Sequence, residues 1–143
     1  FYVHFDDIKR DYFDGMITTG APIEFLEFEE VDFWEELTAI MDWTDLHVTS
    51  TMYQCWGAQA AMYYFYGIKK RILPEKKFGL FWHKVNDRKI PLVRGFDDMF
   101  LAPHSRHTEV RLEDYSGGVQ RSRILSGYVG GRKKNLYPGA SGV

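Results

Sequence analysis

The segment HVTSTMYQCWGAQAAMYYFYG, residues 47–67, constrains the fold more than any other part of this sequence. Residues 47–54 are a polar and β-branched run, which is typical of a strand. Residues 56–67 follow a helical pattern of small and aromatic side chains, and Gly67 is a natural helix C-cap. The single cysteine of the chain, Cys55, lies between the two runs. The segment therefore predicts a strand that turns directly into a helix, with Cys55 at the turn.

A strand and a helix are expected before this segment. Residues 13–22, FDGMITTGAP, are an apolar run that ends in Gly-Ala-Pro, which predicts a buried strand followed by a loop. Residues 31–43 predict a helix that begins with a capping box of Asp32 and Glu35. Its apolar stripe consists of Trp34, Leu37, Ile40 and Met41. Strand, helix, strand and helix in this order indicate an α/β domain with a parallel sheet.

The pattern is less regular after Gly67. Residues 76–85 predict a further strand or one arm of a hairpin, and residues 92–111 predict a short strand followed by a polar loop with histidines. Residues 115–143 are rich in Gly, Ser, Arg and Lys and show neither strand alternation nor a helical stripe. We therefore expect one domain over residues 1–114 and an irregular tail over residues 115–143.

Composition narrows the classes of protein. The chain is 45% hydrophobic and 17% aromatic, which argues against disorder. A net charge of −2 argues against a nucleic-acid partner, and no apolar run approaches the length that spans a membrane. One cysteine excludes an internal disulfide framework and favours a reducing compartment, so we expect a cytoplasmic protein.

The position of Cys55 suits a nucleophile. A residue between a strand and the first turn of a helix lies at the positive end of the helix, which favours the thiolate. Free N–H groups of that turn can hold an oxyanion, and Gly20 and Ala21, at the end of the preceding strand, could supply a second donor. A cysteine is also among the side chains most often buried as a small apolar filler. Position alone leaves both interpretations open.

No local signal places a general base beside Cys55. The five histidines are His4, His47, His83, His104 and His107. The stretch HSRHTE suggests a metal site from His104, His107 and Glu109, but no further ligand cluster supports it, so we expect no metal. Three basic residues could bind a carboxylate or a phosphate: Lys76, Lys77 and Arg106.

Four separated blocks resemble the homoserine O-acyltransferases of methionine biosynthesis: FDGMITTGAPIE, HVTSTMYQCWGAQA, LPEKKFG and RGFDDMFLAPHSRHTEVR. The similarity runs in register from Phe1 to about Asp114. It implies an α/β fold that is flavodoxin-like and class I glutamine amidotransferase-like, a three-layer sandwich with a mostly parallel sheet. We expect this sandwich to be incomplete at both ends, with residues 1–114 as a partial catalytic domain.

The resemblance also implies a ping-pong reaction. An acyl-CoA acylates Cys55, and the thioester then passes its acyl group to the hydroxyl of L-homoserine, with no separate cofactor. The backbone N–H groups near Ala21 and Trp56 match the oxyanion donors, and Lys76 and Ser105 match positions that contact substrate. A homodimer of the intact parent protein is compatible with the resemblance.

Glu24 matches the position linked to the choice of acyl donor. In this family a glycine there goes with succinyl-CoA and a glutamate with acetyl-CoA. A carboxylate in the acyl pocket repels the carboxylate of a succinyl group and fills its space. The resemblance therefore favours acetyl transfer, with succinyl transfer as the alternative.

The sequence departs from the family at its triad. The His and Glu of the family triad lie in an HPE-containing segment that this sequence does not contain, so we expect a marginally stable and nearly inactive chain, as a frameshift or truncation would give. Two other interpretations remain. A glutamine amidotransferase-like hydrolase usually carries Gly-x-Cys-x-Gly, where this chain has Tyr53, and a non-catalytic remnant would need no triad.

Overall fold

The computed structural model describes residues 2–85, 88–89 and 93–111 and the backbone of four short strands farther along the chain. The helices are α1 (Phe5–Ile8), the 3-10 turn η1 (Phe28–Glu30), α2 (Trp34–His47) and α3 (Trp56–Tyr66). The strands are β1 (Phe13–Thr18), β2 (Val48–Gln54), β3 (Arg71–Lys84), β4 (Met99–Glu109), β5 (Ile124–Leu125), β6 (Tyr128–Arg132), β7 (Asn135–Leu136) and β8 (Ser141–Gly142). Four of these strands fall within residues 115–143, where an irregular tail was expected.

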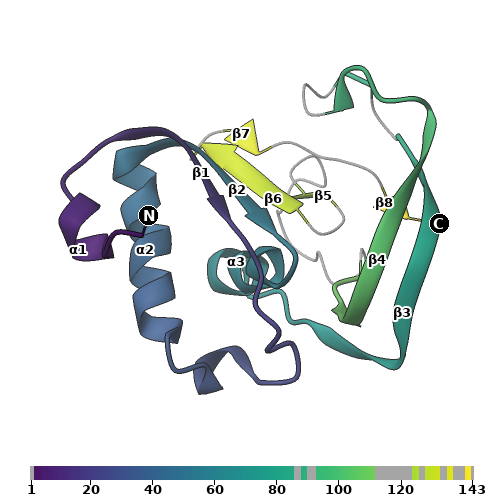
Figure 1. The fold of residues 1–143 in the computed structure, drawn as a ribbon, viewed down its shortest axis with the longest axis horizontal. Coiled ribbons are helices and arrows are strands. Elements are labelled where there is room, and N and C mark those ends of the chain that lie inside the picture. The colour runs from purple at the N-terminus through teal and green to yellow at the C-terminus, as the bar shows by residue number, and fades with distance from the viewer. Residues whose placement is uncertain are drawn as a thin grey trace.

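The first sheet begins with the predicted β–α–β unit. β1 and β2 pair in parallel from Phe13 opposite Val48 to Thr18 opposite Tyr53, and α2 connects them (Figure 1). β6 then pairs with β2 in the antiparallel sense, and the order continues to β5. The strand and the loop expected within residues 13–22 are confirmed, with the strand over Phe13–Thr18, but the expectation that the strand is buried is wrong. It is an edge strand in the described sheet, and Ile17 on it is 65% exposed.

Helix α2 begins later than the sequence pattern suggested. Its N-cap is Phe33, which makes no side-chain capping hydrogen bond, so the predicted capping box of Asp32 and Glu35 is wrong. The backbone of the preceding turn caps the helix instead: the N–H of Trp34 donates to the carbonyl of Val31 at 2.8 Å. Three members of the predicted stripe pack in or against the core: Trp34, Leu37 and Met41.

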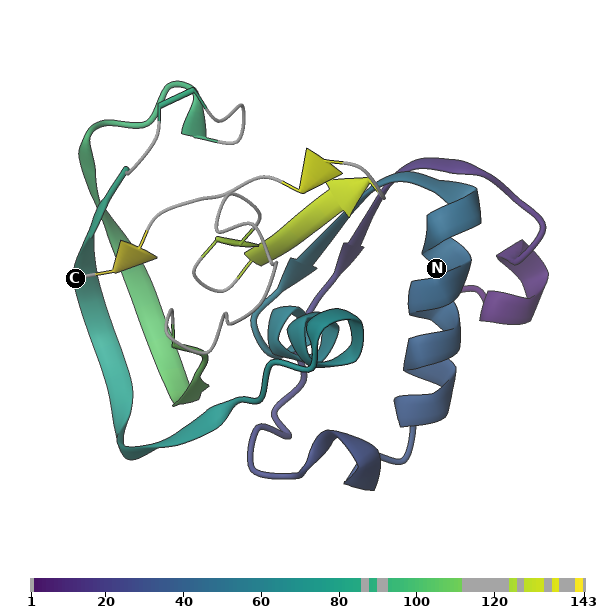
Figure 2. The same ribbon diagram turned by 180° about the vertical axis from the view of Figure 1, so that it is seen from behind.

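Both long helices cover the same face of β2. The ring of Tyr53 on β2 lies 6.2 Å from Phe65 of α3, and its hydroxyl is hydrogen-bonded to Thr44 of α2. Burial of this ring raises the pKa of Tyr53 to about 12. Figures 1 and 2 show the two helices from opposite sides of the molecule. The apolar core fills the space between them and β2, and it contains Phe28, Met41, Tyr53, Trp56, Ala58, Ala60, Ala61, Met62 and Ile68.

The second sheet is antiparallel. β3 pairs with β4 along most of its length, and the short β8 pairs with the far end of β3. The strand over residues 76–85 is confirmed as a hairpin arm, whereas the polar loop expected within residues 92–111 is wrong, because residues 99–109 are the other arm. The alternation of exposed and covered positions along MFLAPHSRHTE accounts for this strand, although its histidines and charges suggested a loop.

The α/β class is therefore confirmed, but the described part of the chain has less parallel sheet than expected. Parallel pairing is limited to β1 and β2 among the described strands. The described part of the chain does not establish a flavodoxin-like three-layer sandwich with a mostly parallel sheet, since its long helices lie on one face of β2. Its longest helix, α2, has 14 residues, and none of its helices combines the length and apolar character of a membrane span.

Two histidines face each other across the β3–β4 hairpin. The Nε2 atoms of His83 and His104 are 2.7 Å apart, and the two rings stack at 4.9 Å. Burial, together with the positive charges of Arg106 and Lys77, lowers the pKa of both histidines, that of His104 to about 4. The folded hairpin therefore favours a neutral pair, in which one Nε2 donates to the other.

Acidification is expected to destabilise the hairpin through this pair. The unfolded chain protonates a histidine near pH 6.5, whereas the folded chain does so at a lower pH. The stabilising contribution is therefore present above about pH 6.5 and is lost as the pH falls from there toward about 4. Thermal melts at pH 7 and pH 4.5 should show a smaller loss of Tm for His104→Phe than for the unchanged chain. Equal losses would contradict this, and His4→Phe, at an exposed position, is the control.

Candidate active site

Cys55 occupies a strained turn between β2 and α3. Its backbone has φ 57° and ψ −129°, and it is the one non-glycine residue with positive φ among the described residues. Such a conformation costs of order 1–3 kcal/mol and persists where the surrounding structure holds it. The turn raises the side chain out of the sheet, and Cys55 is exposed. The strand-to-helix turn predicted from the sequence is confirmed, and the interpretation of Cys55 as a buried apolar filler is wrong.

The first turn of α3 presents backbone N–H groups beside the thiol. The N–H groups of Ala58 and Gln59 both donate to the carbonyl of Cys55, at 3.1 and 3.3 Å. The N–H of Trp56 comes before them, at a helix position that has no acceptor within its own helix. The polar end of the helix therefore leaves a donor next to the sulfur atom.

The loop after β1 packs directly against this turn. A Cβ atom built on Gly20 would lie 2.8 Å from the backbone N of Trp56 and 3.1 Å from Sγ of Cys55. A Cβ atom built on Gly57 would lie 2.7 Å from the carbonyl oxygen of Thr19. The two backbone segments are thus in contact only because both positions are glycine. This contact brings Ala21 to the same side of the turn as Trp56.

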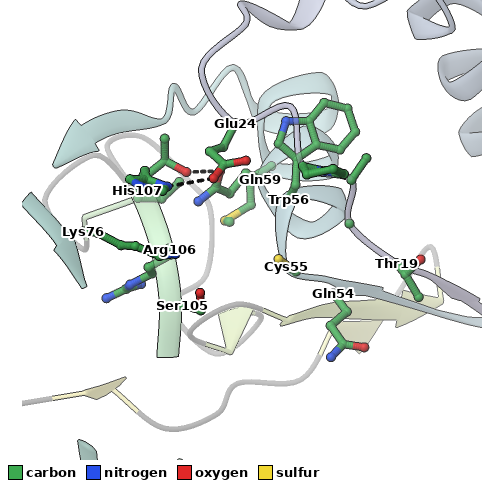
Figure 3. Close-up of a pocket in the computed structure, with 16 residues that line it drawn as sticks. Thr19, Glu24, Gln54, Cys55, Trp56, Gln59, Lys76, Ser105, Arg106 and His107 are labelled. Atoms are coloured by element: carbon green, nitrogen blue, oxygen red, sulfur yellow. Dashed lines mark hydrogen bonds and ion pairs between the residues drawn. The ribbon is translucent and has the colours of Figure 1, made fainter. Parts of the chain in front are cut away.

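One cavity of about 620 Å³ joins the two sheets at this point, and Cys55 opens into it (Figure 3). Its walls come from the loop after β1, the start of α3, and residues of β3 and β4. The six residues that the family resemblance singled out all line it: Ala21, Glu24, Cys55, Trp56, Lys76 and Ser105. Segments far apart in the sequence therefore converge on a single thiol.

A hydrogen bond joins the side chains of Glu24 and His107 in this cavity. Nδ1 of His107 lies 2.9 Å from Oε1 of Glu24, and their side chains are 32% and 25% exposed. The pKa of the Glu24 carboxyl is lowered, first by a hydrogen bond from its own backbone N–H and then by His107. The sequence named both residues for other reasons but not their pairing, because they are 83 positions apart and no local pattern connects them.

The suggested metal site on β4 does not form. His104 faces His83, His107 binds Glu24, and Glu109 lies 2.9 Å from Nε of Arg111. The three side chains therefore have different partners. Within the part of the chain that the structure describes, no group of three or more His, Cys, Asp or Glu residues could hold a metal ion.

Basic side chains give one wall of the cavity a positive charge. Of the three basic residues that the sequence suggested for an anion, Lys76 and Arg106 line the cavity. Lys77 instead lies with Nζ 4.7 Å from the centre of the Phe81 ring. The cavity thus combines an exposed thiol, a carboxylate held by a histidine, and two cations. It can accept an acyl compound that carries a negative charge elsewhere.

Comparison with known proteins shows which protein family this chain is related to. The family model described as homoserine O-succinyltransferase matches residues 1–127, which includes the first part of the segment set apart as a tail. A homoserine O-acetyltransferase of Agathobacter rectalis is 66% identical over 114 residues, which are 80% of this chain and 37% of the relative. That of Clostridium beijerinckii is 62% identical over 126 residues, 88% of this chain and 41% of the relative. That of Parabacteroides distasonis is 57% identical over 114 residues, 80% of this chain and 37% of the relative.

The chain therefore spans roughly two fifths of the length of these relatives. Its match to the family model nevertheless covers more than half of its own residues and includes the whole cavity. This chain belongs to the homoserine O-succinyltransferase family.

Proposed function

We propose that this chain carries the acyl-accepting part of a homoserine O-acetyltransferase active site. Cys55 would take an acetyl group from acetyl-CoA, and in the whole protein the thioester would pass it to the hydroxyl of L-homoserine. The observation that carries the proposal is the convergence of all six predicted residues on one cavity around an exposed thiol. The printed names of the relatives, homoserine O-acetyltransferase, support the reaction class.

The first half-reaction exchanges one thioester for another. The thiolate of Cys55 attacks the carbonyl carbon of acetyl-CoA, and the tetrahedral oxyanion accepts hydrogen bonds from the N–H groups of Trp56 and Ala21. The intermediate collapses with cleavage of the bond to the CoA sulfur, which leaves as a thiol carrying the proton from Cys55. In the second half-reaction the homoserine hydroxyl attacks the acetyl carbonyl, and O-acetylhomoserine leaves with recovery of the cysteine thiol.

Polar and charged residues of the cavity would position the substrates. Lys76 and Ser105 stand on the β3–β4 side of the cavity, where an ammonium and a hydroxyl can bind the polar groups of homoserine or of the acyl-CoA. Glu24 would occupy the acyl end and favour acetyl over succinyl, since two carboxylates repel each other there. Succinyl transfer is the second candidate, favoured by the description of the family model. A cytoplasmic location would keep the thiol reduced.

Acetylation of Cys55 tests this proposal. We expect that incubation of the chain with acetyl-CoA adds one acetyl group, located on Cys55 by peptide mass spectrometry, and that Cys55→Ala takes none. Iodoacetamide labelling of the folded chain checks that the thiol is accessible. A folded chain whose Cys55 reacts with iodoacetamide but never with acetyl-CoA would contradict the proposal and favour a non-catalytic remnant.

A further inference from the structure

Glu24 needs an anchor to act on the acyl group. It lies in the connection between β1 and η1, outside any regular element, and a glutamate side chain has several rotatable bonds. A carboxylate that is free to move would spend much of its time away from the place where the acyl group of the donor binds. His107 supplies an anchor, because it lies on β4 between Arg106 and Thr108, and both of these neighbours pair with β3 on either side of the bulge opposite His107.

The contact between the two residues is specific and supported by packing. Nδ1 of His107 and Oε1 of Glu24 are 2.9 Å apart, and the ring of Phe25 lies 4.9 Å from the His107 ring. Phe25 follows Glu24 in the chain, so two successive side chains of the loop rest on one histidine. Figure 3 shows the pair side by side on the wall of the cavity, with Cys55 farther along it.

A competing partner for Glu24 is close by. Lys76 lines the same cavity, and its charge contributes to the lowered pKa of the Glu24 carboxyl. Without His107, the carboxylate would be drawn toward this ammonium, which would neutralise both groups. The histidine thus holds Glu24 at the acyl end and leaves Lys76 available for substrate.

We propose that His107 is a positioning residue for the choice of acyl donor: it holds the Glu24 carboxylate where a succinyl carboxylate would have to bind. This inference rests on the proposed function, because it concerns the acyl group that reaches Cys55. His107 acts only through Glu24, so its replacement should change nothing once Glu24 has been removed.

Competition between two donors tests the role. The chain is incubated with equal concentrations of acetyl-CoA and succinyl-CoA, and the ratio of succinyl to acetyl groups on Cys55 is measured by mass spectrometry. A hydrogen bond to a charged group in a partly exposed pair is worth about 1 kcal/mol, so His107→Gln should raise the ratio about three- to tenfold. Glu24→Gly should raise it at least as much, and the double variant should match Glu24→Gly. His4→Gln, the same change at an exposed position, is the control and should match the unchanged chain.

Several outcomes would overturn the inference. An unchanged ratio in His107→Gln with less total labelling would indicate a purely structural role. A further increase when His107→Gln is added to Glu24→Gly would show that His107 does not act through Glu24. Circular dichroism checks that the variants fold, and His107→Leu replaces any His107→Gln variant that does not.

A second measurement does not depend on acylation. Carbon-13 NMR of the Glu24 carboxyl should give a pKa below the ordinary value in the unchanged chain, an increase in His107→Gln and no change in His4→Gln. A Glu24 pKa that is the same in the unchanged chain and in His107→Gln would overturn the inference. If no variant takes an acyl group while the NMR shift is found, the proposed function and the selectivity role both fail, but the pairing of His107 with Glu24 stands.

Discussion

Replacing Gly20 or Gly57 with alanine is expected to slow acylation of Cys55 by about 100-fold or more, because an error of about 1 Å in the position of a nucleophile costs that much. The new methyl group of Gly57→Ala would lie 2.7 Å from the carbonyl oxygen of Thr19, and that of Gly20→Ala 2.8 Å from the backbone N of Trp56. Real Cβ atoms do not come so close to backbone, so one of the two segments must move. In Gly20→Ala the methyl group would also enter the space between the two proposed oxyanion donors.

The measurement is the rate of acetyl incorporation on Cys55 from acetyl-CoA, followed by mass spectrometry. Gly15→Ala is the matched control, because it is the same substitution on β1 and its added Cβ atom would meet only the carbonyl of Ser50, at 3.8 Å. We expect Gly15→Ala to react at nearly the rate of the unchanged chain. A Gly20→Ala variant that reacts equally fast would show that the loop after β1 takes no part in the reaction.

The elements next to the nucleophile could be predicted because their signals are local. A β-branched run, a cysteine and a small-residue helix adjoin one another in the chain, so the strand, the turn and α3 follow from residues 47–67 alone. The C-cap at Gly67, with φ 67°, followed from its residue type in the same way. The convergence of Glu24, Lys76 and Ser105 on Cys55 was expected only from the family resemblance, because these residues are far apart in the sequence.

Features that depend on tertiary contacts could not be predicted in this way. The Asp32 and Glu35 pattern fits a capping box, but burial of Val31 in the turn before α2 places Phe33 at the N-cap and lets the Val31 carbonyl accept the N–H of Trp34. The histidines of β4 read as a polar loop, although pairing with β3 makes them part of a strand. The pairing of His107 with Glu24 belongs to the same class, because it exists only when the two sheets come together.

Replacing Phe28 with alanine is expected to cost about 3–5 kcal/mol in the free energy of unfolding. Phe28 is 2% exposed, and its ring lies 4.7 Å from Tyr63, 5.4 Å from Trp34 and 5.7 Å from Trp56. It therefore joins α2 and α3 to each other and supports the residue that follows Cys55. Small domains are stable by only about 5–15 kcal/mol, so this single cavity would remove a large share of the total.

Urea denaturation of the two variants Phe28→Ala and Phe78→Ala measures this effect against a matched control. Phe78 is 74% exposed on β3, so the same substitution there should change the free energy of unfolding by no more than about 0.5 kcal/mol. If Phe28→Ala does not fold, Phe28→Leu keeps most of the volume and should cost about 1.5 kcal/mol. Phe28→Ala should also slow acetylation of Cys55, because Trp56 loses the ring against which it packs. Equal stability of the Phe28 and Phe78 variants would mean that the contacts of Phe28 with α2 and α3 do not stabilise the fold around Cys55.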